Sequence, residues 1–235
     1  MSGAGGSAQR EFERRRKKER AAVRSNLAWT VPLVLLSAVA GGVLIQKFVG
    51  SLGVLAGVLI AIVLGFELWG TSSHISAYGK GAEGERLTGR TLDNLPGYVV
   101  LHDRKIPGSK ANIDHIAIGP GGVFAIETKN YTGEVKARGD DLFVGGRRRT
   151  STVEQTWREA VAVQGVLAEH LARLAIDVVP VLCIHGSQVP WETVQGVRIV
   201  GPRGLKKLIS ASPTRLHDGD IRVMVDIANS ALLPS

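Results

Sequence analysis

Cysteine is scarce in this sequence, because Cys183 is the only one among 235 residues. A single cysteine excludes an intrachain disulfide and also excludes a cysteine-based zinc cluster within one chain. Cys183 lies in the apolar run VVPVLCIHG, which favours a buried, unreactive thiol over a nucleophile. The sequence also lacks a GxxxxGK[ST] phosphate-binding loop and any internal repeat at a period typical of solenoids.

Basic residues are unevenly distributed along the chain. Residues 1–26 hold eight Lys or Arg and three Asp or Glu, so they supply +5 (8 − 3) of the net charge of +8. The remainder is only mildly basic, and the overall charge is therefore a weak argument for nucleic-acid binding. We expect residues 1–26 to form a basic cytoplasmic tail next to an anionic membrane surface.

Two long apolar runs follow this tail. Residues 27–45 contain no charged residue and, as a helix, would extend about 28 Å, which is close to the thickness of a bilayer core. A second run covers 52–69 and is interrupted only by Glu67. We therefore predict two transmembrane helices within residues 27–70, at about 27–46 and 52–69.

The orientation of these helices follows from the basic excess before the first span. Both termini are expected in the cytoplasm, which makes the chain a two-span protein of the cell membrane. A cleaved signal peptide is the alternative, because the small residues 37–40 resemble a cleavage site. The apolar run continues past them, however, and a second run follows, which favours the hairpin.

Residues 71–235 have the composition of a soluble α/β domain. Apolar periodicity and turn residues predict helices at 83–95, about 152–174, near 205–209 and about 221–232. They predict strands at 98–101, 112–118, 123–128, 133–137, 142–144, 178–184 and 197–200.

The stretch 112–130 reads as a β-hairpin with an acidic site at its open end. Residues 119–122, Gly-Pro-Gly-Gly, have the composition of a tight turn. If these four residues form the loop, Asp114 faces Glu127, and Lys129 shares their face of the sheet. Facing carboxylates repel each other unless a cation or a proton lies between them. Mg²⁺ or Mn²⁺ suits such oxygen ligands, so the pattern indicates a metal-dependent nuclease site. For the ExK triplet alone, a solvated strand face is the alternative.

Three motifs together resemble a known family. They are Gly81-Ala82-Glu83-Gly84-Glu85, Ile113-Asp114-His115, and GVFAIETKN at 122–130 followed by Gly133. The resemblance is to the nuclease-related domain (NERD) family, which is grouped with the PD-(D/E)XK fold, and it covers about residues 77–175. It implies a restriction-endonuclease-like α/β fold, in which helices flank a mixed central sheet.

The resemblance also implies a metal site at the hairpin. Asp114 and Glu127 would ligate the metal together with the backbone carbonyl of Thr128. Lys129 would orient the attacking water or help to deprotonate it. Glu85 matches the acid that often completes the metal shell in this fold, although an ordinary first-turn glutamate favoured by the helix dipole would look the same.

A glutamine on the helix after the core sheet is expected as well, and Gln155 is preferred over Gln164. The loop residues Arg147, Arg148 and Arg149 are expected to grip a phosphate backbone, with a solvated loop as the alternative.

These expectations combine into a membrane-anchored, cytoplasm-facing nuclease that hydrolyses the phosphodiester bonds of DNA or RNA. Any ATP-driven strand separation would require a helicase partner. The alternative is a catalytically inactive nucleic-acid-binding or scaffold module at the membrane. A purely structural membrane protein that recruits partners would leave the facing acids unexplained.

Overall fold

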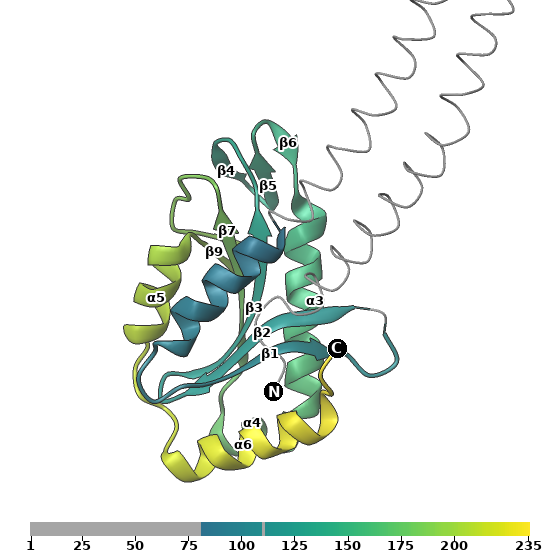
Figure 1. Cartoon of the computed structure of the whole chain (residues 1–235), viewed down its shortest axis with the longest axis vertical. Helices are drawn as coiled ribbons and strands as arrows, with labels where there is room; N and C mark the ends of the chain where they lie inside the picture. Colours follow the sequence, from purple (N-terminus) through teal and green to yellow (C-terminus); the bar gives the residue numbers. More distant parts are fainter. Residues whose placement is uncertain (1–80, 110) are drawn as a thin grey trace, which may run out of the picture. The chain divides into compact units, whose positions relative to one another are not determined.

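The computed structural model describes residues 81–109 and 111–235 (Figure 1). The predicted tail at 1–26 and the predicted membrane hairpin at 27–70 lie outside the described residues. None of the helices within 81–109 and 111–235 combines the length and apolar character that a membrane span requires.

A six-stranded mixed sheet forms the centre of the described region, with the order β1-β2-β3-β7-β9-β8. The pairs β1–β2, β2–β3 and β8–β9 are antiparallel, whereas β3–β7 and β7–β9 are parallel. The strands are β1 (Val99–Lys105), β2 (Asn112–Gly119), β3 (Gly122–Asn130), β7 (Val178–His185), β8 (Glu192–Val194) and β9 (Val197–Val200). The predicted mixed α/β architecture is confirmed.

Helices cover both faces of this sheet (Figure 1). One face carries α3 (Thr150–Val166), α4 (Ala168–Leu174) and α6 (Asp218–Ala231), and the other carries the helix at 81–93 and α5 (Pro202–Ser210). Side chains alternate along β3, so Val123 and Ala125 join the core under α3 and α6. Phe124 and Ile126 join the core under the helix at 81–93 and α5. This alternation decides which helix each later residue of β3 meets.

A small second sheet precedes α3. It consists of β4 (Val135–Arg138), β5 (Asp141–Val144) and β6 (Arg147–Arg148). The prediction of strands at 133–137 and 142–144 was therefore close. Arg147 and Arg148, which we expected in a loop, instead pair with β5.

The predicted helix at about 152–174 is two helices. Leu167, with φ −99° and ψ 6°, lies between α3 and α4, and its side chain is buried. Val163 of α3 and Leu171 of α4 belong to the same core cluster. The short edge strand β8 was not predicted, because most of its residues are exposed and carry no apolar alternation.

The β2–β3 hairpin has the predicted register. His115 pairs with Ile126 and Ile118 with Val123, so position numbers of paired residues sum to 241 as expected. The turn itself is shorter than predicted, because Gly119 and Gly122 also pair. Gly122 has φ +124°, a conformation that glycine adopts without a steric penalty.

Candidate active site

The end of β3 carries the predicted acid and lysine into the space beneath α3. Glu127 is almost fully buried, whereas the side chain of Lys129 is about one third exposed. Both are odd-numbered, so they point to the α3 side of the sheet, like Val123 and Ala125. The ammonium group of Lys129 forms an ion pair with Oε1 of Glu127.

Asp114 reaches the same place from β2. The β2–β3 ladder ends at the pair His115–Ile126, one residue short of the predicted pairing of Asp114 with Glu127. Asp114 Oδ2 instead accepts a hydrogen bond from the backbone N–H of Thr128 at 2.8 Å. Burial raises the pKa of Asp114 well above its usual range, and the neighbouring Glu127 raises it further. The two acids are therefore neighbours although the ladder stops before them.

Helix α3 contributes Gln155 to the cluster. Its Nε2 donates to Glu127 Oε1 at 2.9 Å and to Glu159 Oε1 at 2.8 Å. Gln164, the alternative glutamine, lies elsewhere: its Oε1 accepts from the backbone N–H of Val178 at 2.7 Å. The structure thus brings Gln155, and not Gln164, to the acids.

Glu159 is a member of the cluster that the sequence interpretation missed. It is buried, and burial followed by the charge of Asp114 raises its pKa to about 7. A signal was present in the sequence, because Glu159 follows Gln155 by four residues and so shares its face of α3. The prediction for this helix named a glutamine and no acid.

Glu85 approaches from the helix at 81–93. Burial, followed by the charges of Asp114 and Asp103, raises its pKa to about 8, while Lys129 lowers it. Glu83, in the same motif, is exposed.

Negative groups outnumber positive groups in this cluster. The cluster contains four carboxyl groups, those of Glu85, Asp114, Glu127 and Glu159. The ammonium group of Lys129 is close enough to lower the pKa of all four. Burial, followed by the charge of Glu159, raises the pKa of Glu127 to about 8. Burial lowers the pKa of Lys129, but Glu127 and Asp114 outweigh it and raise the pKa above its usual value. Bound protons or a further cation must therefore balance the cluster at neutral pH.

The donor set fits a hard divalent cation. Oε2 of Glu127 and Oε2 of Glu159 are buried and accept no hydrogen bond from another group of the described residues, and the two carboxyl groups lie close enough to share a proton. Oε1 of Glu127, in contrast, accepts from both Lys129 and Gln155. Carboxylate oxygens of this kind suit Mg²⁺ or Mn²⁺. Within 81–109 and 111–235, no group of three His, Cys, Asp or Glu side chains has the arrangement of a metal site.

A pair of buried histidines lies on the other face of the sheet. The Nδ1 atoms of His102 and His115 are 2.9 Å apart, and His102 Nε2 lies 2.9 Å from Asp93 Oδ1. Burial, followed by the charge of His102, lowers the pKa of His115 to about 3. His115 is therefore a neutral packing residue and does not face the acids next to Asp114.

The three arginines at 147–149 differ in their surroundings. Arg148 forms an ion pair with Asp141 at 2.7 Å, and the Arg149 guanidinium lies 4.7 Å from the ring centroid of Tyr131. Tyr131 comes directly after β3, so Arg149 lies at the same end of the sheet as Lys129. Arg147 is exposed.

No solved structure matches this chain. An uncharacterized protein of Bacillus anthracis is 46% identical over 59 residues, a similarity that covers 23% of this chain and 28% of that protein. The model of a family described as Nuclease-related domain matches residues 80–185. This range includes Glu85, Asp114, Glu127, Lys129, Gln155 and Glu159, so residues 80–185 are similar to the nuclease-related domain family over the part of the chain that carries the acidic cluster.

Proposed function

We propose that residues 71–235 form a restriction-endonuclease-like domain that hydrolyses phosphodiester bonds of DNA, or of RNA, with Mg²⁺ or Mn²⁺. One observation carries the proposal: acids from two strands and two helices gather around Lys129 at one end of β3. A buried cluster with this excess of negative charge is costly for stability unless a cation is one of its ligands. The family match over 80–185 supports the same class of reaction.

Asp114, Glu127 and the Thr128 carbonyl would hold the ion, with Glu85 completing the set. When bound, the ion supplies a Lewis acid beside the scissile phosphate and favours ionisation of water there. Gln155 fixes Glu127 by a hydrogen bond at 2.9 Å and leaves Oε2 of Glu127 open.

Lys129 would serve in electrostatic positioning. Its raised pKa keeps it protonated at neutral pH in the metal-free protein. Its ammonium group therefore offers a charge-assisted hydrogen bond to the attacking water or to a phosphate oxygen as negative charge develops. When the site binds the metal ion, Lys129 would separate from Glu127.

A catalytically inactive nucleic-acid-binding module is the second candidate. The ion pair between Lys129 and Glu127 favours it, because that contact neutralises an acid without a metal. Such a module would bind nucleic acid at the membrane without cutting it.

Cleavage assays on the full chain, purified in a mild detergent, separate the two candidates. Plasmid, linear duplex, single-stranded DNA and RNA would each be incubated with Mg²⁺, Mn²⁺ or EDTA. We expect metal-dependent cleavage that Asp114→Asn and Lys129→Met reduce by at least ~100-fold. Glu154→Gln, an exposed acid on α3, is the matched control. Binding without cleavage in either metal would favour the inactive module.

The membrane anchor is part of the proposal. The uncharged residues 27–45 and the apolar run at 52–69 support two spans, with both termini in the cytoplasm. The full chain should remain in the membrane fraction after an alkaline wash, and a chain without residues 27–70 should not. Reporters fused to either terminus should both be active in the cytoplasm. A periplasmic or extracellular signal from either reporter would contradict this topology.

A further inference from the structure

A groove lies beside α5, away from the acidic cluster. It has a volume of about 630 Å³ and is lined by residues that follow β7 and by the start of α5, including Ser187, Val189, Trp191, Arg203 and Gly204. A second groove of about 520 Å³ is lined by Arg203, Lys206 and Lys207, and Arg203 lines both grooves. Residues of helix α5 thus line two neighbouring surface hollows.

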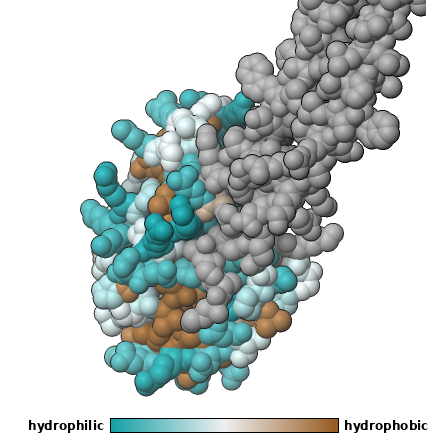
Figure 2. All heavy atoms as spheres, viewed as in Figure 1, coloured by the Kyte–Doolittle hydropathy of each residue, from teal (hydrophilic) through white to brown (hydrophobic). Residues whose placement is uncertain are grey.

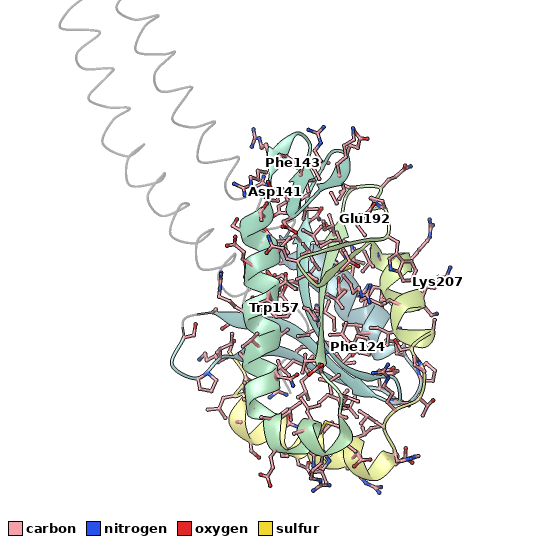
Figure 3. All side chains as sticks on the ribbon, turned by 180° about the vertical axis from the view of Figure 1, so that it is seen from behind. Phe124, Asp141, Phe143, Trp157, Glu192 and Lys207 are labelled. Atoms are coloured by element: carbon pink, nitrogen blue, oxygen red, sulfur yellow. The ribbon has the colours of Figure 1, made fainter. Side chains whose placement is uncertain are left out.

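Trp191 is the aromatic residue of the first groove. About 48% of its surface is exposed, and Lys207 Nζ lies 5.6 Å from the centroid of its ring. A large exposed indole held beside a cation offers a flat surface on which a nucleic-acid base can stack. Figure 3 shows Lys207 on α5.

The charge on α5 is also unusual. Arg203 lies in the first turn, where the helix dipole disfavours a cation, and that turn contains no acidic residue. Lys206 and Lys207 follow on the same helix, and none of the three forms an ion pair with a carboxylate of the described residues. These three cations and the one nearby acid, Glu192 next to Trp191, together carry a net charge of +2 (3 − 1). Hydrophilic residues line the α5 edge in Figure 2.

The groove lies at the same edge of the sheet as the end of β3. Strands β3, β7 and β9 are parallel, so their carboxyl ends meet at one edge, and β9 lies two strand spacings, about 10 Å, from β3. Ser187, which lines the groove, donates a hydrogen bond to the Tyr131 carbonyl at 2.8 Å. Tyr131 is two residues after Lys129. A strand lying along this edge would therefore connect the groove with the acidic cluster.

We propose that a single-stranded segment of nucleic acid binds across these two grooves, with a base stacked on Trp191 in the first and phosphates contacting Arg203, Lys206 and Lys207 along α5. The assignment rests on the proposed nuclease function and adds to it a class of substrate. A duplex hides the faces of its bases, so stacking on Trp191 selects an unpaired strand.

Fluorescence anisotropy of a labelled single-stranded oligonucleotide tests the proposal, with the full chain in EDTA so that no cleavage occurs. Trp191→Ala should weaken binding about 5- to 150-fold, and Trp191→Phe should restore most of the affinity. Trp157→Ala is the matched control, because Trp157 on α3 is 49% exposed but lies on the opposite face of the sheet (Figure 3). It should bind like the wild type.

The salt dependence of oligonucleotide binding provides a second measurement. It would not change if the cations on α5 had only a structural role. Replacing Arg203, Lys206 and Lys207 by Gln should reduce the slope of log affinity against log salt by about 0.7 for each phosphate that the protein no longer neutralises. The same variants would be tested on vesicles that contain anionic lipid. Weaker vesicle binding with unchanged oligonucleotide binding would overturn the proposal in favour of a lipid surface.

Two further outcomes would also overturn it: equal binding by Trp191→Ala and the wild type, or a preference for the duplex of the same sequence. Because binding is measured without metal, a protein that binds through Trp191 but never cleaves would refute the nuclease function alone. A protein that cleaves while Trp191→Ala binds normally would refute the groove alone.

Discussion

Glu159→Gln should make the metal-free protein less sensitive to rising pH. Glu159 is buried, its pKa is raised to about 7, and its Oε1 accepts from Gln155 at 2.8 Å. The amide oxygen of a glutamine can accept the same hydrogen bond, and the volume hardly changes. The substitution therefore removes an ionisable group while leaving the packing of α3 in place.

The sign of the effect follows from proton binding. A buried acid with a raised pKa holds its proton in the folded protein at a pH where the unfolded chain has lost it, so stability falls as pH rises. For Glu159 this window runs from the usual value of 4.5 to about 7. At about 1.36 kcal/mol per pH unit, the wild type should lose roughly 3 kcal/mol through this group. Glu127, with a pKa of about 8, adds to the loss and continues it to higher pH.

Urea denaturation of the full chain in EDTA, at intervals from pH 5 to pH 8, measures this loss. We expect Glu159→Gln to lose at least about 2.5 kcal/mol less than the wild type over this pH range, because the pKa of Glu127 also falls once its acidic neighbour is neutral. Glu154→Gln, on the exposed side of α3, should behave like the wild type. Parallel stability curves for wild type and Glu159→Gln, or a wild type that gains stability up to pH 8, would refute the reasoning.

Three further predictions concern the ion, the glutamine and the hairpin. Mg²⁺ or Mn²⁺ should raise the melting temperature clearly at pH 8 and little at pH 5, since protonated carboxyl groups bind metal poorly. At a metal concentration of 100 times the dissociation constant, the free energy of unfolding should rise by ~2.7 kcal/mol. An equal rise of the melting temperature in Asp114→Asn would count against this site. Gln155→Leu should slow cleavage about 10- to 100-fold, because it removes the hydrogen bond to Glu127. Gln164→Leu, which removes the hydrogen bond to Val178, should mainly lower the denaturation midpoint. Similar cleavage rates for both variants would argue against the role of Gln155. Gly119→Ala should cost about 1–3 kcal/mol, because its Cβ would lie 2.3 Å from a ring atom of Tyr98, whereas Gly165→Ala meets no atom within 4 Å and should be neutral or stabilising.

Much of the hairpin site could be predicted from sequence because its geometry is local. Alternation fixes the faces of β3, and the glycine-rich turn fixes the register, so Asp114, Glu127 and Lys129 follow from counting. The choice of Gln155 required the resemblance to a family, because a helix that begins twenty residues after β3 has no local relation to it.

Features that depend on tertiary packing could not be predicted in the same way. The break at Leu167 lies next to a core shared with α6; no proline marks it, and Gly165, two residues earlier, is its only local sequence signal. Trp191 and Lys207 meet only because β8 and β9 return the chain to α5. Neither relation leaves a periodic signal in the sequence.

The acidic cluster at the end of β3 and the cations on α5 both depart from the usual placement of charges in proteins. The two groups have opposite signs and lie at the same edge of the sheet. Acids are in excess at the end of β3, where burial makes them costly, and cations are in excess on α5, where Arg203 lies in a first turn that disfavours a cation. Such local conflicts are expected where function outweighs stability. A polyanion would be repelled by the acids alone, but a divalent ion held by them reverses the local field, and cations further along the edge would then attract the same strand. Both departures therefore have one physical explanation: a negatively charged polymer that crosses this edge over a bound metal ion.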